Sequence, residues 1–312
     1  MTSSRSGQDV PGGAEKKSRL QALKEMLASR GLAPQKKFGQ NFMVDTNFAL
    51  AVARDAAADQ HTLLIEIGPG TGCLTQALLD SHPASRVLAV EIDRGLAALL
   101  RETFAPSLAE NKLTLIEGDA LASKHELSPQ LVETIERIST TENRPRRVLC
   151  ANLPYNAATP LLANMAVDDQ NTQITSVIAT VQLELAQRLF ADPNKSAYGA
   201  LTVLLSLRAS GGIVRRVGGE VFWPRPRVES AVIKLDFKPW PEEASDAPSS
   251  LKRSEAARFQ TFLQTVFSQR RKTLRAVLRP AIIPESLGLP PDARAEALSP
   301  ETILKLFRAL KT

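Results

Sequence analysis

The sequence predicts an α/β protein with a doubly wound, mostly parallel sheet, followed by a small C-terminal helical domain. From residue 63 onwards, short apolar runs alternate with helical patterns, which is the order of strands and crossover helices in a parallel sheet. Residues 240–250 are rich in proline and serine, as expected of a linker. Beyond residue 259, apolar residues recur at helical spacing, which predicts a separate group of helices.

The elements are expected in a regular order along the chain. A polar tail over 1–18 is predicted to be disordered, and a short amphipathic helix follows, with Ser18 as its N-cap and Gly31 at its end. Strands are then expected at residues 63–67, 86–92, 112–117, 147–151 and 175–181. The predicted helices are 74–80, 96–104, 127–138, 160–167 and 184–190.

The end of the predicted sheet is less regular. Residues 200–206 fit either a helix or a strand. The apolar runs 212–217 and 230–237 have no helix between them, so one of the two is expected to run antiparallel at the edge of the sheet. The predicted organisation is a basic tail with a short helix (1–30), a catalytic domain (31–239), a linker (240–250) and a small helical RNA-binding domain (251–312).

Composition excludes several classes of protein. No apolar run approaches the roughly 18 residues that a membrane span needs, and no apolar segment follows the first charges as in a secretory signal. Cys73 and Cys150 are the two cysteines, and neither they nor the three scattered histidines show metal-ligand spacing. We therefore expect a monomeric cytoplasmic protein that binds no metal and no membrane.

Positive charge gathers at the two ends of the chain. Of a net charge of +6, residues 1–40 hold 8 Lys and Arg against 3 Asp and Glu, and residues 250–312 hold 12 against 5. The middle is mildly acidic, with 19 against 25. Basic flanks around an acidic centre suit a protein that holds a polyanion beside a cationic cofactor, although ordinary solvated surface charge would also account for these totals.

A glycine-rich turn follows the first strand of the predicted sheet. Residues 66–72 read Glu-Ile-Gly-Pro-Gly-Thr-Gly, and glycine lets the backbone approach a ligand where a Cβ would collide. A dinucleotide fingerprint would need a glycine at position 73, which is Cys73. The pattern resembles instead motif I of class I methyltransferases, with Gly68 and Gly70 as cofactor-binding candidates, and a plain tight turn is the alternative.

Carboxylates end the next two strands. Glu91 follows Gly68 by 23 residues, where an α/β nucleoside site places the acceptor for ribose hydroxyls. Asp119, after the third strand, is suitably placed for an adenine amino group. An acidic rim favours the cationic cofactor S-adenosylmethionine over a pyrophosphate cofactor.

The fourth strand ends in Asn152-Leu153-Pro154-Tyr155, which resembles the N/D-P-P-Y motif of amino methyltransferases that act on adenine or cytosine. An exocyclic amine is a poor nucleophile, because its lone pair is delocalised into the ring. The Asn152 side chain and a backbone carbonyl near Leu153 or Pro154 could accept its two N–H groups and orient the nitrogen. Tyr155 offers a ring on which an extruded base can stack.

With these motifs in order, the chain resembles the ribosomal RNA small-subunit adenine dimethyltransferase A family from about residue 31 to its end. The matching segments are residues 36–45, 65–72, 90–93, 118–120, 152–156, 197–199, 222–232, 267–278 and 294–301. The resemblance implies two methyl transfers to each of two neighbouring adenines near the 3′ end of small-subunit (16S) rRNA, and a role in subunit assembly. It also implies that Gly68, Glu91, Asp119 and Asn152 contact S-adenosylmethionine, that Asn41 and Met43 help to enclose it, and that residues 152–155 hold the adenine.

Two departures from the family pattern concern the base. Leu183 stands where the family usually has lysine, and Ala179 stands where some members have an aromatic residue. An aromatic clamp on both faces of the adenine is therefore in doubt. A longer insertion around residues 123–147 and the N-terminal tail lie outside the match.

Basic residues at both ends of the chain are the RNA-binding candidates. Arg270, Arg271, Lys272 and Arg275 are expected on one amphipathic helix, and Lys36 and Lys37 lie beside the cofactor segment. Two rival functions remain: an adenine methyltransferase with another target, such as large-subunit rRNA or DNA, and a non-catalytic RNA-binding assembly or transcription factor. The segments at 222–232 and 267–278 argue against the first, and the intact set of predicted site residues argues against the second.

Overall fold

A computed structural model of the chain describes residues 12–168, 170–242, 250–279, 281, 283 and 287–310. Its strands are β1 (Phe42–Met43), β2 (Thr62–Ile67), β3 (Arg86–Glu91), β4 (Leu113–Glu117), β5 (Leu121–Ser123), β6 (Glu126–Leu127), β7 (Arg146–Asn152), β8 (Ser176–Gln182), β9 (Ala209–Val217), β10 (Phe222–Trp223) and β11 (Ser230–Phe237). Its α-helices are α1 (Gly12–Ser29), α2 (Thr46–Asp55), α3 (Cys73–Ser81), α4 (Arg94–Thr103), α5 (Ala105–Ala109), α6 (Pro129–Thr141), α7 (Tyr155–Val167), α8 (Leu183–Leu189), α9 (Ala200–Arg208), α10 (Arg253–Ser268), α11 (Leu274–Val277) and α12 (Pro300–Ala309). The 3-10 helices are η1 (Lys36–Phe38), η2 (Gly219–Val221) and η4 (Ala295–Ala297). None of the described helices is long and apolar enough to cross a membrane.

The central sheet has seven strands in the order β4-β3-β2-β7-β8-β11-β9. The first five run parallel to one another, and β11 pairs antiparallel with both β8 and β9. This confirms the predicted fold class. Residues 200–206, which fitted either a helix or a strand, belong to helix α9. The expected position of the antiparallel strand is wrong, because β11 lies one place in from the edge. Its run of buried residues suits an inner strand, whereas the glycines and arginines of β9 suit the exposed edge.

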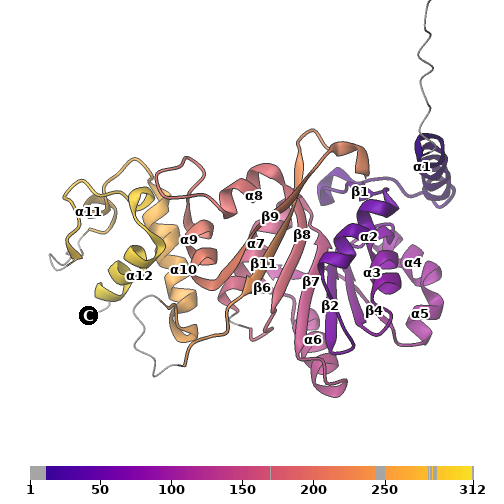
Figure 1. Ribbon diagram of the computed structural model, residues 1–312, viewed down its shortest axis with the longest axis horizontal. Helices are drawn as coiled ribbons and strands as arrows, with labels where there is room; N and C mark the ends of the chain where they lie inside the picture. The colour runs from indigo at the N-terminus through magenta and orange to yellow at the C-terminus, as the bar shows by residue number, and fades with distance from the viewer. Residues whose placement is uncertain are drawn as a thin grey trace, which may run out of the picture.

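Helices cover both faces of the sheet (Figure 1). In β2 the side chains alternate, with Leu63 and Ile65 in the core cluster that also holds residues of α6, α7 and α9. Leu64 faces the opposite way, into the cluster with residues of α2 and α3. Because both faces are covered, the middle residues of these parallel strands are mostly apolar, whereas Glu66 and Glu91 stand near the strand ends.

Polar side chains fix where several helices begin. The side chains of Asp45, Asp93, Ser128 and Ser299 each accept a hydrogen bond from a backbone N–H in the first turn of α2, α4, α6 and α12. Such caps satisfy donors that have no partner inside the helix. Asp93 caps the helix that follows β3, so it also fixes the chain directly beside Glu91.

The N-terminal helix begins earlier than its sequence indicates. It starts at Gly12, so Ser18 lies inside α1 and is not its N-cap, and the expected disorder over 12–18 is wrong. Residues 1–11 of the predicted tail lie outside the described residues. In the C-terminal half of α1, Leu27 is buried in a cluster with Phe42, Leu96 and Leu99.

The C-terminal helices pack directly on the main core. Phe259 and Leu263 of α10 and Leu304 of α12 belong to the same buried cluster as the residues of α7 and α9. A smaller cluster, which includes Val266 and Leu306, lies beneath α11. The boundary at residues 240–250 therefore stays a sequence-based prediction, because the core is continuous across it.

Candidate active site

The carboxyl ends of β2, β3, β4 and β7 meet at one edge of the sheet, as the parallel order requires. Two adjoining hollows lie there. The first is lined by Asn41, Glu66, Glu91 and Asn152, among others, and the second by Ile92, Asp119 and Ala120, among others. Phe38, Gly68 and Pro154 line both, so the two hollows form one continuous site.

The structure brings together all the predicted cofactor-binding and catalytic residues. The first hollow is lined by Asn41, Met43, Gly68, Gly70, Glu91, Asn152, Leu153, Pro154 and Tyr155. Asp119 lines the second hollow, and its Oδ1 accepts from the N–H of Leu121 at 2.9 Å.

Glycine is required in the turn after β2. Gly68 and Gly70 have backbone φ angles of 71° and 60°, which residues with a Cβ rarely adopt. A Cβ on Gly70 would also lie 3.0 Å from the ring of Phe42. The turn therefore holds its shape through positive φ and through the close approach of β1.

Glu91 fixes this turn from the neighbouring strand. Its two carboxylate oxygens accept hydrogen bonds at 2.9 Å from the N–H of Gly70 and from the N–H of Asp93. Burial raises the pKa of Glu91, while these N–H donors act against the rise. These hydrogen bonds hold the Glu91 side chain in place at the wall of the first hollow.

Asp93 was not among the predicted site residues, although it holds the N-terminal segment over the site. Its Oδ2 accepts from the side-chain amides of Gln35 at 2.6 Å and Gln40 at 3.3 Å. Gln40 in turn accepts from the backbone N–H of Gln35 at 2.8 Å. These bonds dock residues 35–40, which precede β1, onto the end of β3.

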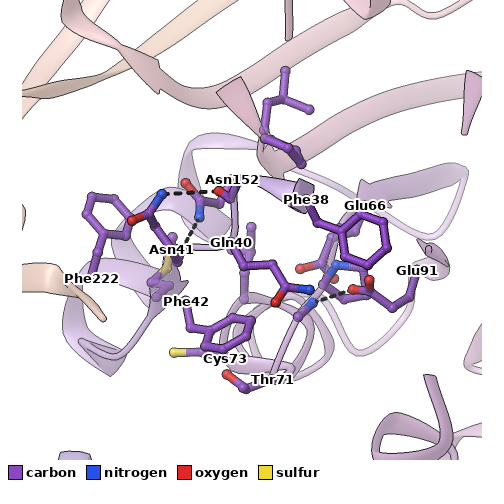
Figure 2. Close-up of a pocket in the computed structure, with 18 of the residues that line it drawn as sticks. Phe38, Gln40, Asn41, Phe42, Glu66, Thr71, Cys73, Glu91, Asn152 and Phe222 are labelled. Atoms are coloured by element: carbon purple, nitrogen blue, oxygen red, sulfur yellow. Dashed lines mark hydrogen bonds between the residues drawn. The ribbon is translucent and has the colours of Figure 1, made fainter. Parts of the chain in front are cut away.

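Asn41 and Asn152 lie side by side on one side of the first hollow, opposite Phe38 and Glu91 (Figure 2). The Nδ2 of Asn152 donates to the carbonyl oxygen of Asn41 at 3.0 Å. Because a carbonyl can only accept, this bond fixes the orientation of the Asn152 amide and leaves its Oδ1 as an acceptor. No donor among the described residues occupies that oxygen.

The residues after Asn152 resolve which backbone carbonyl is available. The Pro154 oxygen accepts from the N–H groups of Ala157 and Ala158, both at 3.0 Å, as α7 begins. The N–H of Leu153 donates to Thr180 at 3.1 Å, but within the described chain no donor reaches the Leu153 oxygen. Asn152 and Leu153 therefore each present one open acceptor at the end of β7.

Aromatic side chains from distant parts of the chain reach the same hollow. Tyr155 begins α7, and its hydroxyl lies 3.5 Å from Ser230 Oγ. Phe222 of β10 is brought in because β10 pairs with β1, with Phe222 opposite Met43. Ala179, by contrast, is fully buried inside β8, so the rings that line this hollow besides Tyr155 are those of Phe38, Phe42 and Phe222.

Glu66 is a further carboxyl that sequence reasoning left without a role. It is 1% exposed, lines the first hollow, and accepts from Thr75 Oγ1 at 2.7 Å. Burial raises its pKa to about 8. Its place in the E-x-G-x-G-x-G motif was the signal that could have identified it.

None of the basic RNA-binding candidates lines either hollow. Lys36 and Lys37 are exposed on η1, next to Phe38. The prediction of one helix through 267–278 is wrong, because α10 ends at Ser268 and Thr273 caps the start of α11 through the N–H of Ala276. Arg271 and Lys272 are exposed in the turn between the two helices, and Arg275 is exposed on α11.

Arg270 differs from its neighbours in that turn. Its guanidinium donates to the carbonyl oxygen of Ser196 at 2.7 Å and to Glu296 Oε2 at 3.2 Å. The N–H of Asn194 donates to the Glu296 carbonyl at 2.8 Å. Arg270 thus connects the turn to two other segments of the protein.

The chain is similar to known ribosomal RNA methyltransferases over most of its length. The family model for ribosomal RNA adenine dimethylase matches residues 32–312. The ribosomal RNA small subunit methyltransferase A of Acidothermus cellulolyticus is 38% identical over 301 residues, which cover 93% of each chain.

Two solved structures share the fold. A dimethyladenosine transferase from Plasmodium falciparum has a TM-score of 0.59 and 22% identity, covering 84% of this chain and 94% of that one. The 23S rRNA methyltransferase ErmE has a TM-score of 0.58 and 23% identity, covering 87% and 100%. Because the family model and the relative from Acidothermus cellulolyticus both match most of its length, the chain belongs to the family of ribosomal RNA adenine dimethylases.

Proposed function

We propose that the protein transfers methyl groups from S-adenosylmethionine to the N6 atoms of two adjacent adenines near the 3′ end of small-subunit rRNA, giving N6,N6-dimethyladenosine. The observation that carries this proposal is the pair of open acceptors, Asn152 Oδ1 and the Leu153 carbonyl oxygen, in a hollow that continues into the cofactor-binding residues. An exocyclic amine has two N–H groups, and two acceptors match them.

The residues present fit S-adenosylmethionine. Glu91 and Asp119 place acceptors at successive strand ends, suited to ribose hydroxyls and an adenine amino group. Ile92, which is 38% exposed, offers an apolar surface in the second hollow for a base. The glycine turn brings backbone to the wall of the first hollow, and Asn41, Met43 and Asn152 also line it.

When bound, S-adenosylmethionine supplies an electrophilic methyl group. The protein itself contributes position and electrostatics rather than a strong base. Asn152 and Leu153 accept the N–H groups and so direct the nitrogen lone pair, while Tyr155 and Phe222 provide rings beside the base. A monomethylated amine retains one N–H, so one acceptor still orients it for the second transfer.

RNA contact is assigned to exposed cations on both sides of the site. Lys36 and Lys37 lie next to the first hollow, whereas Arg271, Lys272 and Arg275 lie near α11, at the left end of Figure 1. Such contacts bind phosphates without reading sequence. Arg270 is assigned to holding the turn rather than to RNA, because its guanidinium already has two protein partners.

The same function makes the immature small ribosomal subunit the partner and the cytoplasm the place of action, with the protein acting as a monomer and taking part in subunit assembly. The test is radiolabelled methyl transfer from S-adenosylmethionine to under-methylated small subunits, followed by nucleoside analysis of the rRNA. Dimethyladenosine confined to small-subunit rRNA is the expected product. Measurable binding of cofactor and subunit without any transfer would favour a non-catalytic assembly factor.

A further inference from the structure

A separate cavity lies at the opposite edge of the sheet from the active site. It has a volume of about 350 Å³ and is lined by residues that precede β8, end α9 and β11, and begin α10. In Figure 1, β11 descends from the loop near β1 to this lower edge. Since each strand residue advances the chain by about 3.3 Å, the seven residues of β8 separate this cavity from the active site.

Arg208 is the unusual group in this cavity. It is 4% exposed, and its Nε donates to the carbonyl oxygen of Ala166 at 3.2 Å. Its guanidinium carbon lies 3.4 Å from the ring centroid of Trp240. In the part of the chain that the structure describes, neither Nη group has a hydrogen-bond acceptor, although the residue lines the cavity.

Both Nη groups of Arg208 can therefore donate hydrogen bonds to a ligand that enters the cavity. Burial lowers the pKa of Arg208 to about 10, so the group remains a cation at neutral pH. Guanidinium nitrogens match the oxygens of phosphate and carboxylate groups in pairs. The protein therefore holds the Arg208 guanidinium in a position from which it can donate hydrogen bonds to an anion in the cavity.

The other charged groups leave this cavity positive. Lys238 and Arg253 also line it, and Asp168 is the one carboxylate among the described lining residues. Asp168 is already engaged, since its Oδ1 accepts from Thr172 Oγ1 at 2.9 Å and its Oδ2 lies 3.7 Å from Arg253. Among the described lining residues, three cations against one carboxylate leave an excess of two positive charges.

We propose that this cavity binds a phosphate monoester, with the phosphate on the guanidinium of Arg208 and an attached organic group against Trp240 and Phe237. At neutral pH a phosphate monoester carries close to two negative charges, which equals the excess of positive charge among the described lining residues, whereas a carboxylate carries one. The apolar rings beside Arg208 suit a nucleotide. The phosphate could belong to a free mononucleotide or to the terminus of an RNA chain.

The test is calorimetric titration of the full chain, with S-adenosylhomocysteine present in excess to keep nucleotides out of the active site. The probes are 5′-UMP, inorganic phosphate and uridine. We expect 5′-UMP to bind and uridine, which lacks the phosphate, not to bind. Arg208→Gln should weaken 5′-UMP binding at least about tenfold, and Lys238→Gln, on an exposed side chain, should weaken it severalfold.

Arg188→Gln is the matched control, because Arg188 is an exposed arginine on α8 outside this cavity, and it should bind 5′-UMP as the wild type does. If Arg208→Gln does not fold, Lys238→Gln alone still decides the matter. Equal binding of 5′-UMP and uridine, no binding at millimolar 5′-UMP, or unchanged affinity in the Arg208 and Lys238 variants would overturn the proposal.

A second titration separates the two sources of phosphate. A 5′-phosphorylated tetrauridylate is compared with the same oligonucleotide ending in a 5′ hydroxyl. If the added phosphate strengthens binding in the wild type but not in Arg208→Gln, the cavity accepts an RNA terminus. If only 5′-UMP shows this dependence on Arg208, the site takes a free nucleotide.

Discussion

The two halves of the active site differ in how far the protein satisfies its own polar groups. On the cofactor side, both oxygens of Glu91 accept backbone N–H groups, and Asp93 holds two side-chain amides. On the base side, Asn152 Oδ1 and the Leu153 oxygen have no donor among the described residues, while the Asn152 amide nitrogen is held by Asn41. The polar groups of the cofactor half are therefore held in position by the protein before any ligand binds. In the base half, the two open acceptors gain hydrogen-bond donors when the substrate amine binds.

The largest effect should follow from removing the open acceptor of the base half. Asn152→Ala should lower the rate of methyl transfer by about a thousandfold, as the loss of one well-placed polar group does in other active sites. RNA binding should stay as in the wild type, since the proposed RNA contacts come from basic residues other than Asn152. Single-turnover methyl transfer and filter binding measure the two quantities.

Asn47→Ala is the control for that experiment, because Asn47 is an exposed asparagine on α2 and its loss should leave both quantities unchanged. An Asn152→Ala protein that methylates at the wild-type rate would show that the base half does not act through this amide.

Removing the negative charge of the cofactor half should have the next largest effect. In Glu91→Gln, an amide NH₂ must face either the N–H of Gly70 or that of Asp93, so one hydrogen bond becomes a contact between two donors. We expect affinity for S-adenosylhomocysteine to fall about 10- to 100-fold, from the loss of a hydrogen bond to a charged group. Calorimetric titration gives the affinity. An unchanged value would contradict the claim that the hydrogen bonds of Glu91 hold the cofactor half in its binding geometry.

Substitutions of the basic residues should change RNA affinity without changing either half of the active site. Replacing Arg271 and Lys272 together by glutamine should weaken RNA binding and lower the slope of log affinity against log salt by about 1.4, from two phosphate contacts to single-stranded RNA. Cofactor affinity should not change. Binding measured at four salt concentrations tests this, and a slope equal to that of the wild type would remove these residues from the interface.

The last effect concerns stability rather than catalysis or binding, and it comes from Glu66. Because burial raises its pKa to about 8 from an ordinary value of 4.5, the folded state retains a proton that the unfolded state loses between these two pH values. Stability should therefore fall as pH rises from about 5 to 8, by at most about 1.4 kcal/mol per pH unit. Glu66→Gln should be less sensitive, so its stability relative to the wild type should rise over that range.

Urea unfolding of both proteins at pH 5.5, 7 and 8.5 measures this difference. Parallel pH dependences for the wild type and Glu66→Gln would show that the carboxyl ionises normally in the folded protein.

Sequence patterns were sufficient to place the strand-end residues. Each of them lies at the end of an apolar run, and the alternation of strands with helices implies that these runs are parallel strands with their carboxyl ends at one edge of the sheet. Gly68, Glu91, Asp119 and Asn152 needed no tertiary information to be placed at one edge. Phe222 and Asp93 were not predicted as site residues. Phe222 reaches the site only through the pairing of β10 with β1, and Asp93 acts through glutamines more than 50 residues away.

Helix ends were harder to predict than helix existence. The apolar spacing through residues 259–278 is continuous, but Thr273 offers a local cap that interrupts the helix and exposes Arg271 and Lys272 in a turn. The engagement of Arg270 with Ser196 and Glu296 depends on packing between segments about 26 and 74 residues away. No local pattern distinguishes it from the two basic residues that follow it.

The most direct test of the central claim is a crystal structure with S-adenosylhomocysteine and a short RNA that contains the target adenines. The account predicts that the adenine N6 atom lies within hydrogen-bond distance of both Asn152 Oδ1 and the Leu153 carbonyl oxygen, with the base beside Tyr155 and Phe222. An N6 atom that contacts neither acceptor, or a base bound outside the first hollow, would contradict it.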